Sequence, residues 1–170
     1  MPHMDIRLTD RQKAWIEDAA AVSGKNGSPP TSLTPERWLF RIMRNAASAT
    51  RGTWLSIEQR GYTEGENKGQ KFRIPLSKIP SLEWPAEEKE RTEGALRLFI
   101  SDSLKDALLH TVAVEMATRD EIGMKRAWNT FAEWLDEFVA DRIIEGKAQA
   151  DMQEWEEEEN SLFMPEKKKR

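Results

Sequence analysis

Apolar and polar residues alternate with a period of two at the start of the chain. Met4, Ile6 and Leu8 are apolar and the residues between them are polar, which is typical of a short strand with one buried face. From residue 10 to residue 23 the apolar residues return every three or four positions, which predicts a helix. Thr9 stands just before this helix and opens a capping box, so the strand passes directly into the helix.

A second helix is predicted over residues 35–48. Residues 34–36 supply a capping Thr, a Pro at the first helical position and an acid in the first turn. Trp38 and Ile42 belong to its apolar stripe, and we expect both in the core. Between the two helices, residues 25–33 contain the run Asn-Gly-Ser-Pro-Pro and are expected to form an exposed connection.

The period of the pattern returns to two between residues 53 and 79. Leu55 and Ile57 alternate with polar residues, and Phe72 and Ile74 do the same further on. The residues between these runs are rich in Gly and other turn formers. This stretch therefore predicts a β-hairpin with a long loop.

Helical patterns dominate the rest of the chain. Apolar spacing over residues 86–117 predicts one helix, and Thr118 with Glu121 has the form of a second capping box that opens another. Three apolar residues of this last helix are expected in the core: Phe131, Leu135 and Phe138. An acidic run at residues 154–159 and a basic run at the end of the chain are expected to be frayed or disordered.

Together these patterns predict an α+β fold that is mostly helical, with a short N-terminal strand, one β-hairpin and long C-terminal helices. The strand and hairpin fall in a basic region, residues 4–80; an acidic helical region, residues 81–160, and a disordered tail, residues 161–170, follow. We recognise no internal repeat in the sequence. The first three residues, Met-Pro-His, precede a second Met, and we interpret them as a cloning remnant outside the fold.

Charge divides the chain at the same boundary. Residues 1–80 carry 13 Lys and Arg against 8 Asp and Glu, whereas residues 81–170 carry 13 against 22. Because a basic surface attracts phosphate and an acidic one repels it, a nucleic-acid partner is expected to meet the first half.

The inventory of reactive residues argues against an enzyme. The chain has no Cys, and His3 and His110 are its two His residues, so neither a thiolate nor a two-His metal site nor a Ser-His relay is expected. No Gly-rich phosphate loop or calcium-loop spacing is present. We therefore expect no cofactor and no metal. The apolar runs are too short to span a membrane, and a cytoplasmic protein is expected.

The candidate functional feature of the first half is a basic ridge on the second predicted helix. Arg37, Arg41 and Arg44 are spaced to share one helical face, and arginine suits bidentate contact with phosphate or guanine. Other cations of the first half extend the candidate nucleic-acid surface: Arg7, Arg51, Arg60, Lys71 and Arg73.

The order strand, helix, loop, helix over residues 4–48 resembles the ribbon-helix-helix DNA-binding proteins, which include repressors and antitoxins. The resemblance implies a homodimer in which each copy contributes one strand of a two-stranded ribbon. Asp5, Arg7 and Thr9 would then enter the major groove. A helix followed by a basic hairpin also resembles a winged helix, in which residues 53–79 would be the wing. Either resemblance implies a small DNA-binding regulator of transcription.

An alternative hypothesis places the function in the acidic half. Its helical surface could engage a basic protein, as inhibitor proteins of phages and plasmids do. Opposed charge would speed the encounter, and aromatic anchors would supply affinity. The candidate residues for a protein partner are Trp84, Glu133, Asp136, Glu137 and Trp155.

Overall fold

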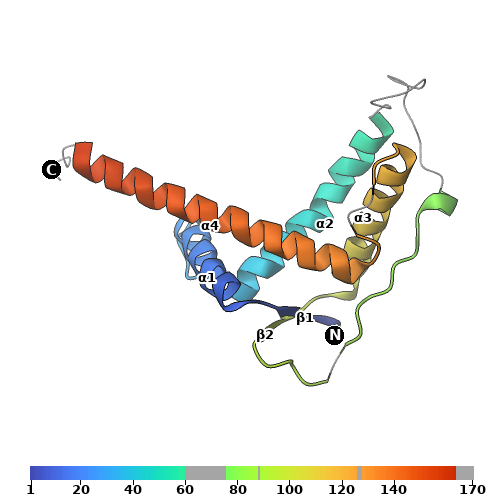
Figure 1. Ribbon diagram of the computed structural model, residues 1–170, viewed down its shortest axis with the longest axis horizontal. Coiled ribbons are helices and arrows are strands. Elements are labelled where there is room, and N and C mark those ends of the chain that lie inside the picture. The colour runs from blue at the N-terminus through green and yellow to red at the C-terminus, as the bar shows by residue number, and fades with distance from the viewer. Residues whose placement is uncertain (60–75, 88, 126–127, 164–170) are drawn as a thin grey trace.

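The structure is a computed structural model that describes residues 1–59, 76–87, 89–125 and 128–163, with backbone alone at 49–59 and 76. The order of elements is β1 (His3–Arg7), α1 (Asp10–Lys25), α2 (Pro35–Gln59), a 3-10 turn η1 (Leu76–Lys78), β2 (Ala95–Phe99), α3 (Asp102–Glu121) and α4 (Phe131–Phe163), as Figure 1 shows. The expected α+β class, dominated by helix, is confirmed. Among the described helices, none combines the length and the apolar character that crossing a membrane requires.

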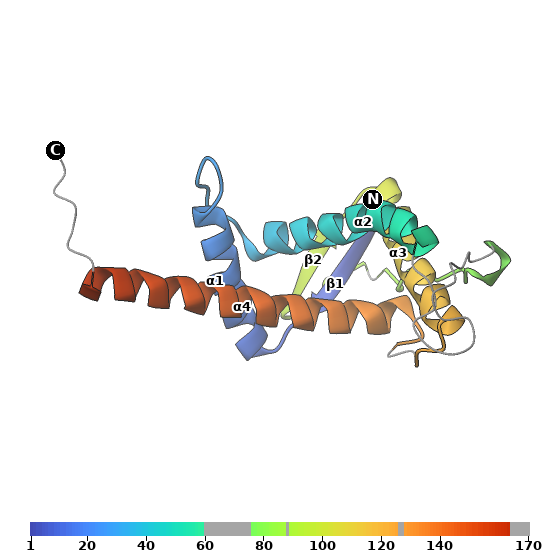
Figure 2. The same ribbon diagram turned by 90° about the horizontal axis from the view of Figure 1, so that it is seen from above.

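The two strands form an antiparallel ribbon in which Asp5 lies opposite Arg97. Met4, Ile6 and Leu98 are buried on its inner face. Seen from above, the ribbon lies between the long helices α2 and α4, with α1 and α3 at the two ends (Figure 2). The polar residues of the strands therefore face away from the core.

The chain passes through the order strand, helix, helix twice, and the matching positions agree. Thr9 and Ser101 are the N-caps of α1 and α3, and each accepts a hydrogen bond from a backbone amide three residues on, at 3.1 and 3.2 Å. Thr34 and Thr130 do the same for α2 and α4, at 3.2 and 3.1 Å. Each of these Thr residues is followed four positions later by Trp-Leu. The repeated order is accompanied by shared caps and apolar positions rather than by a readable sequence identity, so it is not evident from the sequence alone.

The helices of each half pack mainly against helices of the other half. The most extensive contacts between helices join α1 to α4 and α2 to α3, while α1 with α2 and α3 with α4 touch less. In each half, therefore, the first helix is covered mainly by the second helix of the other half.

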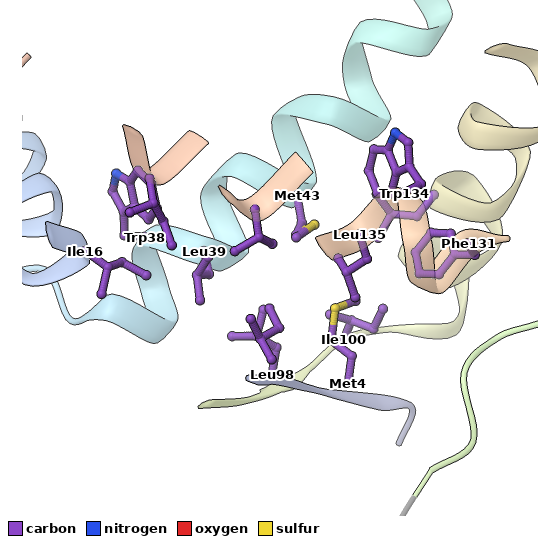
Figure 3. Close-up of a cluster of buried hydrophobic side chains, with 14 of the residues drawn as sticks. Met4, Ile16, Trp38, Leu39, Met43, Leu98, Ile100, Phe131, Trp134 and Leu135 are labelled. Atoms are coloured by element: carbon purple, nitrogen blue, oxygen red, sulfur yellow. The ribbon is translucent and has the colours of Figure 1, made fainter. Parts of the chain in front are cut away.

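The core lies between the inner face of the ribbon and the helices (Figure 3). Trp38, Phe131 and Leu135 are buried there, as expected. Ile42 and Phe138 pack against this core but keep part of their surface exposed, so their prediction is met only in part. They lie at the margins of their helical stripes, where solvent reaches one side.

Gly146 marks the closest approach of α4 to the other helices. A Cβ atom built at this position would lie 2.7 Å from the Cβ of Ala19 and 3.0 Å from Cζ2 of Trp38. The absence of a side chain therefore lets α1, α2 and α4 meet at one point.

The predicted hairpin is wrong where the structure describes it. Leu55 and Ile57 belong to α2, which continues to Gln59 instead of ending near residue 48. Alternation over four residues does not separate strand from helix, and extending a formed helix avoids a new nucleation step. Most of the expected return strand, including Phe72 and Ile74, lies outside the described residues, and its end forms the 3-10 turn η1 (Leu76–Lys78) instead of a strand.

The helices predicted in the second half differ from those of the structure in two places. The helix expected over residues 86–117 is divided into β2 and α3, so strand is not confined to the first half. Thr118 does not open a helix, because it is buried inside α3, where its hydroxyl donates to the carbonyl of Val114 at 2.7 Å. The last helix begins later, after Thr130.

Both ends of the chain are more ordered than expected. The acidic run at residues 154–159 is helical and belongs to α4, which continues to Phe163. Residues 164–170 of the expected tail lie outside the described part. At the start, His3 is the first residue of β1 and Pro2 accepts a hydrogen bond from Ile100, so these residues belong to the fold.

Candidate nucleic-acid interface

Helix α2 positions the basic ridge of Arg37, Arg41 and Arg44. Its apolar residues Leu39 and Met43 are fully buried, and this burial fixes the rotation of the helix. All three arginines are exposed to solvent or partly so as a result. Within the described residues, no hydrogen bond or ion pair involves their guanidinium groups, so the ridge presents its charge to solvent.

The structure brings few of the other predicted cations to this ridge. Arg7 is exposed at the end of β1, on the ribbon rather than on α2. Arg51 continues α2, but its side chain is not described. The remaining candidates lie outside the described residues: Arg60, Lys71 and Arg73.

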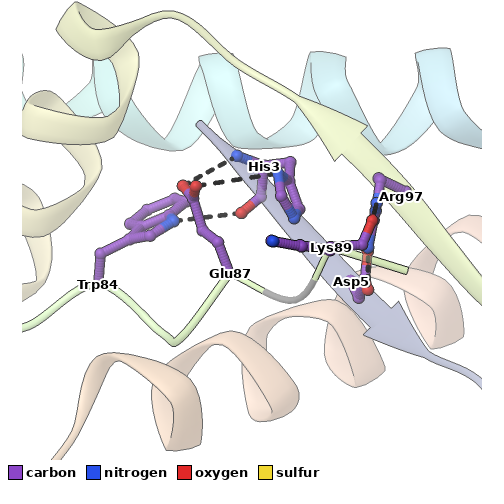
Figure 4. A network of polar contacts seen from close by, with 6 residues as sticks. All are labelled: His3, Asp5, Trp84, Glu87, Lys89 and Arg97. Atoms are coloured by element: carbon purple, nitrogen blue, oxygen red, sulfur yellow. Dashed lines mark hydrogen bonds and ion pairs between the residues drawn. The ribbon is translucent and has the colours of Figure 1, made fainter. Parts of the chain in front are cut away.

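The centre of the outer ribbon face holds an ion pair. Arg97 donates from Nε and Nη2 to the two carboxylate oxygens of Asp5, at 2.7 and 2.9 Å, and from Nη1 to the carbonyl of Lys89 at 3.1 Å (Figure 4). Hydrogen bonding to Arg97 lowers the pKa of the Asp5 carboxyl below its usual value, although partial burial acts in the opposite direction. The acid of the strand is thus neutralised by the opposite strand.

A connecting segment covers the adjoining edge of β1. The indole Nε1 of Trp84 donates to the carbonyl of His3 at 3.2 Å, and the amide of His3 donates to Glu87 at 3.2 Å (Figure 4). The ring of Trp84 also stacks on Phe131, with centroids 5.1 Å apart. These contacts satisfy backbone groups that an edge strand would otherwise expose. Trp84, a candidate anchor for a protein partner, therefore makes its contacts with other residues of its own chain.

The acidic candidate residues for a protein partner lie together near the start of α4, whereas Trp155 lies near its other end. Glu133 accepts a hydrogen bond from the amide of Asn129 at 2.9 Å and so helps to cap the helix. Asp136 and Glu137 are exposed one turn later. Trp155 is exposed near the far end of the helix. The structure therefore places Glu133, Asp136 and Glu137 on one face of α4, but it does not bring Trp155 to that face.

Sequence reasoning missed Arg97, the residue that completes the ribbon face. The alternation that predicts a strand is nevertheless present in the sequence. Leu96, Leu98 and Ile100 alternate with Arg97 and Phe99, in the same way as the apolar residues of the first strand alternate with polar ones. Its partner Asp5 is 92 positions away, which no local pattern reveals.

Equivalent helical positions in the two halves carry opposite charge. Counted from the capping Thr of each helix, Arg37 corresponds to Glu133 and Arg41 to Glu137. The same fold thus tolerates acid or base at these positions.

The chain matches no protein-family model, no curated protein and no solved structure. Across the described residues, no cluster of three or more His, Asp or Glu side chains is arranged to hold a metal ion.

Proposed function

We propose that the protein is a small regulatory protein that binds nucleic acid through its basic first half. The observation that carries this proposal is the ridge of Arg37, Arg41 and Arg44, which is solvent-accessible and unpaired among the described residues. Since the equivalent positions of α4 include Glu133 and Glu137, folding alone does not require arginine there. Three arginines on one helical face suit contact with successive phosphates.

The ribbon supports the same proposal. A two-stranded antiparallel ribbon fits the major groove of DNA, and here one chain supplies both strands. Arg7, which is exposed at the end of β1, would add a phosphate contact to those of the ridge, whereas Asp5 and Arg97 at the centre of the ribbon are only 15% and 14% exposed and bond each other. The binding unit is then a monomer, in place of the homodimer that the strand of residues 4–9 had suggested.

Anisotropy titrations of labelled duplex and single-stranded probes at several salt concentrations test the proposal. Replacing all three ridge arginines by Gln should weaken binding to every probe sequence alike. On duplex DNA the slope of log affinity against log salt should fall by about 0.9 for each phosphate that the variant no longer neutralises.

A matched control is Lys125→Gln, which removes an exposed cation from the connection between α3 and α4. This variant should bind almost as tightly as the unmodified protein. Absence of binding at micromolar protein and low salt would refute the proposal, and so would an equal loss of affinity for Lys125→Gln and Arg41→Gln.

A further inference from the structure

The last turns of α4 extend beyond the rest of the fold. We call residues 151–163 the arm. Both views show its end projecting past α1 with no other described element beside it (Figures 1 and 2). The final contacts with α1 are a hydrogen bond from Asn26 to Gln153 at 2.9 Å and an ion pair of Lys25 with Glu157 at 2.8 Å. Both join the same side of the arm to α1.

A stripe of exposed apolar residues begins beside α1 and continues on the side of the arm that is turned away from it. Met152 lines a hollow with Val22 and Asn26 of α1. Trp155 and Leu162 lie across the helix from Gln153 and Glu157.

Met152, Trp155 and Leu162 are 56%, 63% and 76% exposed. Together with Ala148 and Glu159 they repeat at intervals of four and three residues, which is the spacing of a coiled-coil seam. A helix that points such a seam into solvent has an unfilled contact surface.

Acidic residues border this stripe on both sides. The arm contains six Asp and Glu residues and no Lys or Arg. In the heptad set by Met152 and Trp155, the flanking positions hold Glu156 and Glu158, and also Asp151, which pairs with Lys147 at 3.0 Å. Glu159 lies within the seam itself. The seam is therefore apolar at its centre and negative along both borders.

We propose that the arm docks an amphipathic helix of a partner protein whose apolar seam is bordered by Lys or Arg. Such a helix would cover Trp155 and pair its flanking cations with Glu156 and Glu158. A second copy of the arm does not fit, because parallel and antiparallel pairing would both set acids against acids. The docking surface thus lies at Trp155, away from Asp136 and Glu137.

A designed helical peptide can serve as the probe, since the natural partner is unidentified. The peptide has Leu along its seam and Lys at the flanking positions over about four heptads. In fluorescence anisotropy at physiological salt, the full chain should bind this peptide, while a version with Glu at the flanks should not bind. Trp155→Ala should weaken binding by at least about 10-fold, as expected for a central aromatic anchor.

Two control variants make the test specific. Asp136→Lys with Glu137→Lys changes the charge of α4 as much as Glu156→Lys with Glu158→Lys does, yet only the second pair should abolish binding. Arg41→Gln should leave peptide binding unchanged, which separates this proposal from nucleic-acid binding. Circular dichroism of Trp155→Ala should match the unmodified protein, because Trp155 is exposed.

Three results would overturn the proposal. They are equal binding of the two peptides, equal weakening by the two pairs of charge reversals, and unchanged binding by Trp155→Ala. Sedimentation velocity tests the alternative that a second copy of the chain binds the seam. A dimer that dissociates on Trp155→Ala would show that this alternative is correct.

Discussion

The two halves of the molecule have one architecture and opposite surfaces. Each is a strand followed by two helices, with a capping hydroxyl before each helix and a Trp-Leu pair in the second helix. Yet the solvent-facing side of α2 carries Arg37 and Arg41 where α4 carries Glu133 and Glu137. The two halves thus share caps and buried positions but differ in charge at solvent-facing positions such as these.

The ribbon shows why that divergence matters for assembly. Asp5 and Arg97 occupy equivalent places in the two strands and also lie opposite each other, so the pair sits on the approximate two-fold axis of the ribbon. If β1 paired instead with β1 of another molecule, Asp5 would face a second Asp5. The ion pair therefore favours pairing within the chain over pairing between chains.

The largest expected effect tests whether the two halves are equivalent in packing. Trp38 and Trp134 are 7% and 6% exposed, so Trp38→Ala and Trp134→Ala should each lower the free energy of unfolding by about 3–5 kcal/mol. Urea denaturation measures both. Trp155→Ala is the control and should stay within about 0.5 kcal/mol. A large effect of one core Trp and none of the other would break the comparison.

A smaller effect is expected at the ion pair on the axis. Asp5→Asn should cost about 1.5–3 kcal/mol near neutral pH, because it weakens a hydrogen-bonded ion pair. The pKa of Asp5 is lowered from 3.8 in the folded state, so its contribution is complete above that pH and is lost as the pH falls through the folded value. The two proteins should converge in stability in acid. A gap that stays constant from about pH 7 to well below the ordinary carboxyl range would contradict this account.

Gly146 provides a test of how the packing of the two halves differs, because this close contact involves α4 of the second half alone. Gly146→Ala should force the helices apart at a cost of about 1–3 kcal/mol, against which better helix propensity returns about 1 kcal/mol. We expect a net decrease of stability in thermal or urea unfolding. Ala148→Gly, at a position two residues on, is the control and should cost only its propensity, about 1 kcal/mol. A stabilised Gly146→Ala would show that the helices do not meet so closely.

The smallest effect compares the two N-caps. Thr9→Ala and Ser101→Ala should each cost about 1 kcal/mol in urea unfolding, since each removes an acceptor from the start of a helix. Gln12→Ala should destabilise the first half slightly further, because Gln12 also accepts from the amide of Thr9. Ser32→Ala, in an exposed connection, is the control. If Thr9→Ala and Ser101→Ala lowered the free energy of unfolding by different amounts, the two N-caps would not contribute equally to stability.

Much of the fold was predictable where local signals are strong. The strand at Met4, the capping box of α1 and the start of α2 were all predicted correctly, because each depends on neighbouring residues. The strand β2 was missed for a physical reason: Leu96, Ile100, Leu104 and Leu108 keep a spacing of four across the junction of strand and helix. That spacing imitates one continuous helix.

The candidate site divides in the same way. The accessibility of Arg37, Arg41 and Arg44 follows from helical period, so the sequence was enough to predict it. The neutralisation of Asp5 and the internal engagement of Trp84 depend on contacts with residues far along the chain. Such contacts become visible only when the two strands are paired.

The crossing of the halves has a consequence for how the chain folds during synthesis. The helix α1 leaves the ribosome before its main packing partner, α4, which follows all the other described elements along the chain. Until the residues of α4 have emerged, Ile16, Ala19 and Ala20 have no complete surface to bury against. Long-range contacts of this kind slow folding and leave apolar surface exposed on the nascent chain. The first half therefore keeps part of its apolar surface uncovered until the second half has been synthesised.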